Sequence, residues 1–357
     1  MAKRIRIKDI ADMAGVSAGT VDRVLHNRGN VSDTARKAVE KVLKKVDYKP
    51  NIHISSLSIK RTYDIVVTTP ENFKGEYWEK VHDGIRRAQE FYERLSINLI
   101  FLTYDQYTIY SCQDVFTRIL LMSPDAVIIG PTYQDESVQF AKKLKEKEIP
   151  FVFLDSSVEN CKPLAFYTAD HHLCGALMTK LLLSLVDKQS DIAVLQAKRI
   201  GEQSANTSLL RREGVFNYLE EVGYKKEVLM LPFNAYDSVR NERDIVKFFH
   251  ENKNVKGVIV LNSKGNVVAN ILDNHGIGDV KIVSIDLTDS NVEALKKDQI
   301  DFLIDQHPDY QGYMAMKSLL EFLVLKLEPE QANYMPLNIV TKETVDLQLD
   351  FNLLNRI

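Results

Sequence analysis

Two aspartates stand directly after apolar, β-branched segments, where a side chain can serve a binding site. Asp155 follows the segment IPFVFL at 149–154, and Asp286 ends the segment VKIVSID at 280–286. A carboxylate at the carboxyl end of a parallel strand is a poor core residue, but it can accept two hydrogen bonds from ligand hydroxyls. These two side chains therefore predict a binding site for a small molecule rich in hydroxyl groups.

Other reactive residues lack the spacing that catalysis or metal binding requires. No G-x-S-x-G segment presents a serine as a nucleophile, and we find no paired acid and base. His171 and His172 are adjacent, so on a helix they point to different faces, and no second cluster has suitable spacing for a metal. No G-x-G-x-x-G follows an apolar strand, which argues against a dinucleotide. We therefore expect no enzyme activity, no metal and no cofactor.

The N-terminal segment 5–27, IRIKDIADMAGVSAGTVDRVLHN, has the pattern of two short helices joined by a tight turn. Apolar residues have helical spacing on both sides of Gly15, and Ser17 stands where it can cap the second helix. These apolar residues are Ile7, Ile10, Ala11 and Ala14, then Val21, Val24 and Leu25. Such a helix-turn-helix can place its second helix in a DNA major groove. An ordinary helical hairpin would have the same pattern and is the alternative.

The charge of the chain is unevenly distributed. Residues 1–61 hold fourteen Lys or Arg and six Asp or Glu, a net charge of +8. Because the whole chain has a net charge of −3, the remaining residues carry −11. A small basic domain that binds phosphates, joined to a larger acidic part, has this distribution. The charges therefore favour DNA binding by the N-terminal segment.

Length and composition are those of a globular protein. A chain of 357 residues suggests two or three domains, and 45% of its residues are apolar. Three scattered cysteines, Cys112, Cys161 and Cys174, disfavour a disulfide framework and favour a reducing cytosol. The N-terminus lacks the apolar segment of a signal peptide, and no apolar run has the roughly eighteen residues of a membrane span. We therefore expect a cytoplasmic protein.

Beyond residue 62, short β-branched runs alternate with longer amphipathic segments. The expected strands are 63–69, 97–102, 125–130, 149–154, 191–196, 228–233, 255–261, 280–286 and 301–306. The helical segments between them include 78–94, 135–147, 172–186, 205–222, 239–251, 264–274 and 309–326. Apolar strands that alternate with helices indicate parallel sheets covered on both faces. We therefore predict two doubly wound α/β subdomains after an all-α segment with helices near 7–14, 17–25 and 32–46.

The N-terminal motif resembles the DNA-binding headpiece of the lac-repressor (LacI/GalR) family of bacterial transcription regulators. The similarity covers about fifty residues, with the run D-I-A-x-x-A-G-V-S-x-x-T-V-x-R-V-L, a later V-S-D-T and a closing Y-x-P-N. It implies a headpiece at 1–50 and a hinge at 51–61 that folds on operator DNA, where Leu57 would wedge into the minor groove. Ile54 and Ser55 depart from the family's usual Ala-Arg, so an ordinary linker role for Leu57 stays open.

The same resemblance assigns the residues that would contact DNA. Arg23 could make a bidentate contact to guanine, although an ion pair with Asp22, where the family usually has serine, is the alternative. Ser17 and Thr20 would hold phosphates, and small side chains at the start of the helix would approach the base edges. The expected DNA-binding residues are Arg6, Ser17, Ala18, Gly19, Thr20, Arg23, Asn51 and Leu57.

Residues from about 63 to 340 resemble the periplasmic sugar-binding-protein fold, especially its ribose-binding-like branch, which this family uses as its effector core. In that fold the chain crosses three times between two lobes, and ligands bind in the cleft beyond the carboxyl ends of the strands. The resemblance implies a core at 62–340 and a C-terminal tail at 341–357. It divides the core into lobe 1, about 62–161 and 291–322, and lobe 2, about 162–290 and 323–340.

The fold also suggests which residues bind the ligand. Tyr77 and Trp78 match paired aromatics that stack on sugar faces, with a core position as the alternative. Arg211 stands where the fold has a hydroxyl-binding arginine, Asn262 is followed by serine instead of the usual aspartate, and Tyr133 lies near an expected acidic residue. The expected ligand-binding residues are Tyr77, Trp78, Tyr133, Asp155, Arg211, Asn262, Asp286 and Gln306.

These features predict a ligand-responsive transcription regulator, a repressor that binds a pseudo-palindromic double-stranded operator as a homodimer. Its effector would be a sugar or sugar derivative, and no membrane partner is expected. A sugar-binding component of transport or chemosensing is the alternative that the effector fold alone permits, and the basic headpiece argues against it. A carbohydrate-active enzyme would need the acid and base pair that we do not find.

Overall fold

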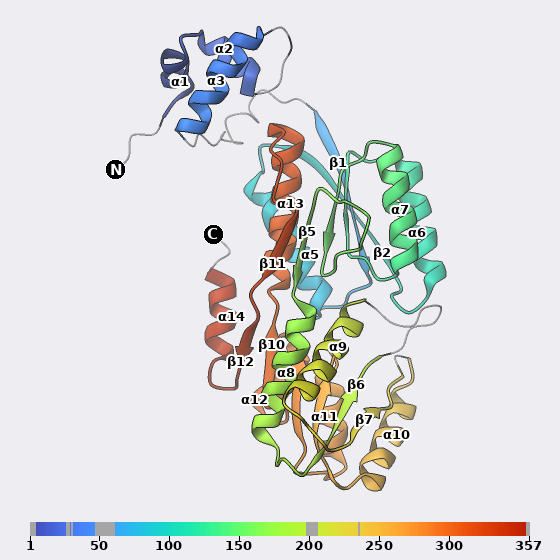
Figure 1. Cartoon of the computed structure of the whole chain (residues 1–357). Coiled ribbons are helices and arrows are strands. Elements are labelled where there is room, and N and C mark those ends of the chain that lie inside the picture. Colours follow the sequence, from blue (N-terminus) through green and yellow to red (C-terminus); the bar gives the residue numbers. More distant parts are fainter. Residues whose placement is uncertain are drawn as a thin grey trace.

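The computed structural model describes residues 5–25, 29, 31–46, 61–197, 206–234 and 236–354 (Figure 1). Residues 51–60 of the expected hinge, with Asn51 and Leu57, lie outside these residues. Within the described ranges, no helix is both long enough and apolar enough to cross a membrane. The chain forms a helical headpiece followed by two α/β lobes, as the sequence predicted.

The headpiece consists of α1 (Ile7–Ala14), α2 (Ala18–Leu25) and α3 (Asp33–Lys45), which pack around a small core centred on Ile10, Val21 and Val39. Gly15 ends α1 with a φ of 66°, a backbone conformation that favours glycine. The Ser17 hydroxyl accepts a hydrogen bond from the Thr20 N–H at 3.1 Å, which caps α2 as predicted. The glycine turn at Gly15 and the cap at Ser17 thus fix the angle at which α2 leaves α1.

Lobe 1 is built on a six-stranded sheet with the order β11-β5-β4-β3-β1-β2, in which every pair is parallel. Its strands are β1 (Thr62–Pro70), β2 (Ser96–Tyr104), β3 (Ala126–Ile129), β4 (Phe151–Leu154), β5 (Ala165–Ala169) and β11 (Ala332–Met335). Helices α5 (Tyr77–Phe91) and α13 (Pro308–Leu325) cover one face, and α6 (Ile109–Met122) and α7 (Gln134–Glu146) cover the other (Figure 1).

Lobe 2 repeats this plan with the order β12-β10-β9-β8-β6-β7, in which the β10–β12 pair is antiparallel. Its strands are β6 (Asp191–Leu195), β7 (Val228–Leu231), β8 (Val255–Val260), β9 (Lys281–Ile285), β10 (Phe302–Asp305) and β12 (Asn338–Val340). Helices α8 (His171–Leu185) and α9 (Asn206–Glu221) cover one face. The other face carries α10 (Ser238–Glu251), α11 (Gly265–Asn274) and α12 (Asp289–Lys296), and α14 (Val345–Leu354) follows β12.

Each lobe holds two helices together through a pair of glycines. In lobe 1, a Cβ added to Gly84 of α5 would lie 1.8 Å from the Asp309 carbonyl oxygen, and one on Gly312 of α13 would lie 2.1 Å from that of Val81. In lobe 2, a Cβ on Gly175 or on Gly214 would lie 1.9 Å from a carbonyl oxygen of the facing helix. Only glycine permits these backbones to approach so closely.

The chain crosses between the lobes three times, but not where the sequence suggested. Strand β5 belongs to lobe 1 because it pairs with β4 and β11, so the first crossing falls before α8 and not near residue 161. Strand β10 belongs to lobe 2, and α13 returns to lobe 1. The segment 341–357, expected as a tail, contains α14, whose Val345 is fully buried in the core of lobe 2. The lobe to which a strand belongs is decided by the strands with which it pairs, and the apolar pattern of the sequence does not reveal these partners.

Candidate functional site

A cavity of about 310 Å³ lies between the carboxyl ends of the two sheets and is lined by both lobes. Seven of the eight expected ligand-binding residues line it: Tyr77, Trp78, Asp155, Arg211, Asn262, Asp286 and Gln306. This volume is at the lower end of the range of roughly 300–1,000 Å³ that is usual for small-molecule pockets. The structure therefore gathers residues that are up to 229 positions apart in the chain, from Tyr77 to Gln306, around one space.

Tyr133 is the exception, and the expectation that it faces the ligand does not hold. Its side chain is fully buried in the core of lobe 1, and its hydroxyl donates to the Gln106 carbonyl oxygen at 3.1 Å. The neighbouring Thr132 lines the cavity in its place. Because the Tyr133 ring packs in the core of lobe 1, the preceding residues Pro131 and Thr132 line the cavity instead.

Asp155 presents lobe 1's carboxylate from the end of β4. Its φ of 63° is uncommon for a residue other than glycine and turns the chain sharply after the strand. The carboxylate accepts a hydrogen bond from the Tyr77 hydroxyl at 2.8 Å, and the Asp155 N–H donates to Gln311 Oε1 at 3.2 Å. Burial, together with the negative charge of Asp155, raises the pKa of Tyr77 well above its usual value, so this hydroxyl remains a donor.

Asp286 occupies the equivalent position of lobe 2, after β9, and also has a positive φ, 73°. Gln306 Nε2 donates to one carboxylate oxygen at 2.8 Å, and the Ser263 hydroxyl donates to the other. Asp286 is 4% exposed, and this burial raises its pKa to about 6, although Arg211 and the two donors oppose the rise. The carboxylate therefore ionises near neutral pH.

Arg211 and His171 connect the two lobes beneath the cavity. The Arg211 guanidinium donates to the Leu261 carbonyl oxygen at 2.9 Å and to His171 Nδ1 at 3.1 Å. The other ring nitrogen of His171 lies 2.6 Å from the carbonyl oxygen of Asp155. Burial and the nearby guanidinium lower the His171 pKa to about 4, so the ring is neutral and accepts from Arg211. The Arg211 Nε–H is buried and makes no hydrogen bond within the described residues.

Aromatic side chains form the lobe 1 wall of the cavity. Tyr77 and Trp78 begin α5, and their rings meet edge to face with centroids 5.2 Å apart. The indole lies over the end of β3, where a Cβ on Gly130 would be 2.5 Å from Trp78 Cη2. The glycine thus makes room for the tryptophan, which remains partly exposed toward the cavity.

Two groups of contacts join the lobes at the edge of the cavity, and sequence reasoning did not predict them. After β1, the Gly75 carbonyl oxygen accepts from the Asp289 N–H at 3.0 Å, and Glu76 pairs with Lys264 at 2.8 Å. After β2, the Tyr236 hydroxyl donates to Asp105 at 3.2 Å. Such pairs depend on how the lobes close, so no local pattern in the sequence indicates them.

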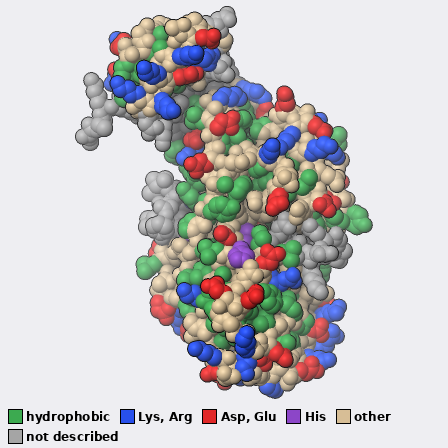
Figure 2. All heavy atoms as spheres, in the orientation of Figure 1, with side chains coloured by type: hydrophobic (Ala, Val, Ile, Leu, Met, Phe, Trp, Pro, Cys, Tyr) green, Lys and Arg blue, Asp and Glu red, His purple; other side chains and the backbone are tan. Residues whose placement is uncertain are grey.

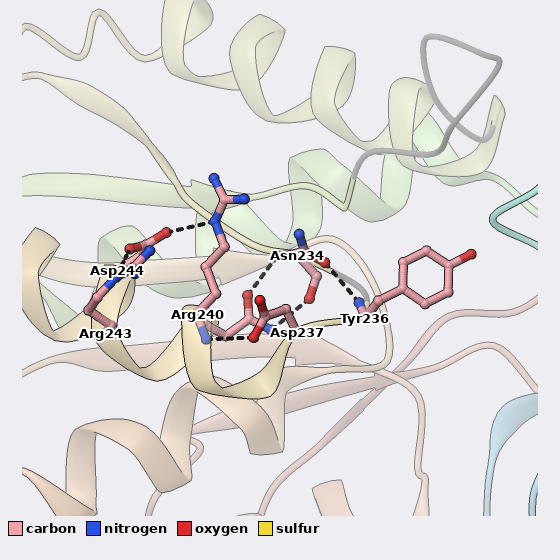
Figure 3. A network of polar contacts seen from close by, with 7 residues as sticks. Asn234, Tyr236, Asp237, Arg240, Arg243 and Asp244 are labelled. Atoms are coloured by element: carbon pink, nitrogen blue, oxygen red, sulfur yellow. Dashed lines mark hydrogen bonds and ion pairs between the residues drawn. The ribbon is translucent and has the colours of Figure 1, made fainter.

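The turn before α10 holds Tyr236 in place, as Figure 3 shows. Asn234 and Asn241 exchange two hydrogen bonds of 2.6 and 2.7 Å, and the Tyr236 N–H donates to Asn234 Oδ1 at 2.9 Å. Asp237 caps α10 by accepting from the Arg240 N–H at 2.9 Å. The Tyr236 side chain points away from this polar cluster and towards lobe 1, where its ring meets that of Tyr107 with centroids 5.2 Å apart.

In the headpiece, the start of α2 is open to solvent. Ser17, Ala18 and Gly19 are exposed, as are Arg6 and Arg23, while Thr20 is half-buried. Figure 2 shows several Lys and Arg side chains gathered on the headpiece. An exposed helix start with basic residues around it has the form of a DNA-reading surface.

Comparison with known proteins identifies both parts of the chain. Residues 65–326 match the periplasmic binding protein domain, and residues 6–51 match the bacterial regulatory proteins of the lacI family. The regulator RegA of Clostridium saccharobutylicum is 25% identical over 92% of this chain and 95% of its own length. DegA of Bacillus subtilis is 28% identical, over 61% of each chain.

Solved structures agree with this assignment. A Bacteroides fragilis chain assigned as a LacI transcriptional regulator covers 80% of this chain and 99% of its own, with 29% identity and a TM-score of 0.77. GanP, a glucose-galactose binding protein of Geobacillus stearothermophilus, has a TM-score of 0.70 with 18% identity over 80% of this chain and 99% of its own, a likeness of fold alone. The two lobes are thus those of a periplasmic-binding-protein-like domain. The chain belongs to the periplasmic binding protein domain family over residues 65–326, and its residues 6–51 form a domain of the lacI type found in bacterial regulatory proteins.

Proposed function

We propose that this protein is a DNA-binding transcription regulator, acting as a repressor in the cytoplasm, whose affinity for its operator is set by a carbohydrate-like effector in the cleft. The observation that carries the proposal is the combination of parts: one chain joins a lacI-type headpiece to a two-lobed domain with a polar cavity. Its relatives include the sucrose operon repressor of Lactococcus lactis, 27% identical over 71% of this chain and 74% of its own. The proposed activity is binding, without catalysis.

On the DNA side, the start of α2 would enter the major groove, with Ala18 and Gly19 close to base edges and Arg23 reading guanine. Ser17, Thr20 and Arg6 would hold phosphates. Because the headpiece is small, two copies in a symmetric homodimer would read a pseudo-palindromic operator. Asn51 and Leu57 complete the proposed DNA contacts from outside the described residues.

On the effector side, the seven lining residues offer complementary chemistry. Tyr77 and Trp78 provide ring faces, and Asp155 and Asp286 provide carboxylate acceptors for hydroxyls. Arg211, Asn262 and Gln306 supply donors and acceptors at the opposite wall. A polyhydroxylated ring has an apolar face, which suits the aromatic side chains, and a rim of hydroxyls, which suits the polar ones.

Effector binding would then regulate DNA binding through the lobes. A ligand that contacts both lobes favours the closed arrangement, and closure changes how the lobes of two subunits pack. This coupling would decide whether the hinge can order on DNA. The interlobe contacts of Glu76 with Lys264 and of Tyr236 with Asp105 support a closed state that is already favoured by the chain itself.

The test is selection of operator DNA with the full-length protein, followed by footprinting near its own gene. Arg23→Ala should weaken operator binding by roughly tenfold to hundredfold, because a bidentate guanine contact is worth about 1–3 kcal/mol. Arg118→Ala, which removes an exposed arginine of α6, is the matched control and should leave binding unchanged. Absence of salt-sensitive binding to any palindrome would refute the proposal.

A further inference from the structure

We propose that the cavity has a second, aromatic subsite at its mouth, which binds the second ring of a disaccharide or an aryl glycoside. The subsite consists of Phe73 and Tyr107. This inference rests on the proposed function, since it takes a carbohydrate ring as the occupant of the inner cavity. It adds that the effector has two rings and is not a single free sugar.

Phe73 is the first observation. Its side chain is 70% exposed although it lines the same cavity as Trp78 and the two aspartates. Scattered apolar side chains on a surface need no explanation, but an exposed ring at the edge of a binding cavity is placed to be covered by what enters it. Phe73 is carried by the segment between β1 and α5, so it stands at the rim and not in the inner cavity.

Tyr107 is the second observation, and it lies on the neighbouring loop. The strands β1 and β2 pair in parallel up to Pro70 and Tyr104, and the Glu71 N–H donates to the Tyr104 carbonyl oxygen at 2.8 Å. The loops that follow these two strands are therefore adjacent, and both contribute a ring to the cavity lining. Two rings on adjacent loops of lobe 1 therefore line the same cavity.

Contacts with lobe 2 fix both loops in position. The loop of Phe73 is held by the Gly75 carbonyl oxygen, which accepts from Asp289, and by the Glu76–Lys264 ion pair. The ring of Tyr107 is held from the side by the edge of Tyr236, at an angle of 69°. The rim is thus assembled by closure of the lobes, and a ligand that extends to it would meet an ordered surface.

The two zones together can hold a ligand with two parts. The inner cavity combines the rings of Tyr77 and Trp78 with the charged groups of Asp155, Asp286 and Arg211, which suit the face and the hydroxyls of one ring. The rim offers the faces and edges of aromatic rings, which suit the C–H face of a second sugar ring or an aryl group.

The experiment compares ligands that share a first ring. The full-length protein is titrated calorimetrically with methyl and phenyl β-D-glucoside and β-D-galactoside, and with the pairs glucose and maltose, glucose and cellobiose, and galactose and lactose. At least one two-ring ligand should bind roughly three- to tenfold more tightly than its one-ring partner, the size expected for one aromatic contact. Phe73→Ala should remove this advantage while leaving one-ring binding within twofold, and Phe73→Trp should keep it.

Tyr110→Ala provides the matched control, because Tyr110 is a 76% exposed aromatic of the same lobe that does not line the cavity. It should leave every affinity unchanged. Equal binding of one-ring and two-ring ligands, or an equal loss of both in Phe73→Ala, would overturn the aromatic subsite and leave the proposed function intact. No binding of any sugar by protein that still binds its operator would overturn both the subsite and the carbohydrate effector.

Discussion

In lobe 1, the aspartate at the end of β4 is hydrogen-bonded by an aromatic hydroxyl, that of Tyr77; in lobe 2, the aspartate at the end of β9 is hydrogen-bonded by Ser263 and Gln306. The strand order and the positive φ at both aspartates are the same in the two lobes. What surrounds them differs: lobe 1 supplies aromatic rings, and lobe 2 supplies hydrogen-bonding side chains. The two lobes thus share one architecture, but lobe 1 lines the cavity with aromatic rings and lobe 2 lines it with polar side chains.

Substitution of the glycines at the helix contacts tests whether both lobes depend equally on close helix packing. Gly84→Ala in lobe 1 and Gly175→Ala in lobe 2 should each lower the free energy of unfolding by about 3 kcal/mol or more, because the added methyl overlaps a backbone carbonyl oxygen that cannot rotate away. Urea unfolding followed by circular dichroism measures this. Gly278→Ala, at an open position of lobe 2, should have little effect. A much smaller loss in only one lobe would show that its helices can separate.

The pH dependence of stability tests how the surroundings of the lobe 2 aspartate, Asp286, affect the fold. Because folding raises the pKa of Asp286 from 3.8 to about 6, its protonated form stabilises the fold below about pH 4, and this contribution is lost as the pH rises to about 6. The change is on the order of 2 to 3 kcal/mol. Asp286→Asn should remove it, so the unfolding free energy of the variant should fall less between pH 4 and 7. Parallel pH profiles for wild type and Asp286→Asn would refute the prediction.

The interlobe contacts test whether the two edges of the cavity contribute equally. Tyr236→Phe removes one hydrogen bond to Asp105 and should cost the closed state about 1 kcal/mol. The Tyr236 pKa is raised to about 12 by desolvation and by Asp105, so this hydroxyl donates across the physiological pH range.

Lys264→Ala removes a half-exposed ion pair with Glu76 and should cost less, about 0.2–1 kcal/mol. Small-angle scattering of the ligand-free protein should show a larger radius of gyration for Tyr236→Phe than for Lys264→Ala. Tyr310→Phe, on an exposed part of α13, should match the wild type. A larger radius of gyration for Lys264→Ala than for Tyr236→Phe would show that the Glu76–Lys264 ion pair is the main contact that closes the lobes.

The sequence predicts the elements of this fold better than their assembly. The nine expected strands are all present, because continuous apolar runs such as those of β1 and β8 mark buried parallel strands. The short strands β5, β11 and β12 were missed, and with them the lobe boundaries. Strands β11 and β12 pair with strands far away in the chain, whereas β5 also pairs with the nearby β4.

For the candidate site too, the sequence predicts individual residues better than the packing around them. Asp155 and Asp286 could be placed because a strand end determines their direction, whereas Tyr133 was misplaced because the packing of its ring in the core of lobe 1 decides its orientation. The ion pair of Lys264 with Glu76 joins residues 188 positions apart and exists only when the lobes meet. His171, weighed only as a metal ligand, connects Asp155 to Arg211 through contacts that no spacing reveals.

The return of α13 to lobe 1 has a consequence for synthesis on the ribosome. Helix α5 is made early, but its glycine face is covered only when α13 emerges, and the ion pair of Arg87 with Asp309 spans 222 residues. At about 5–20 residues per second, this face stays uncovered for roughly 10 to 45 seconds. Lobe 1 therefore cannot complete its fold before the part of lobe 2 from α8 to β10 has been translated, and the nascent chain exposes an apolar surface that chaperones are suited to shield.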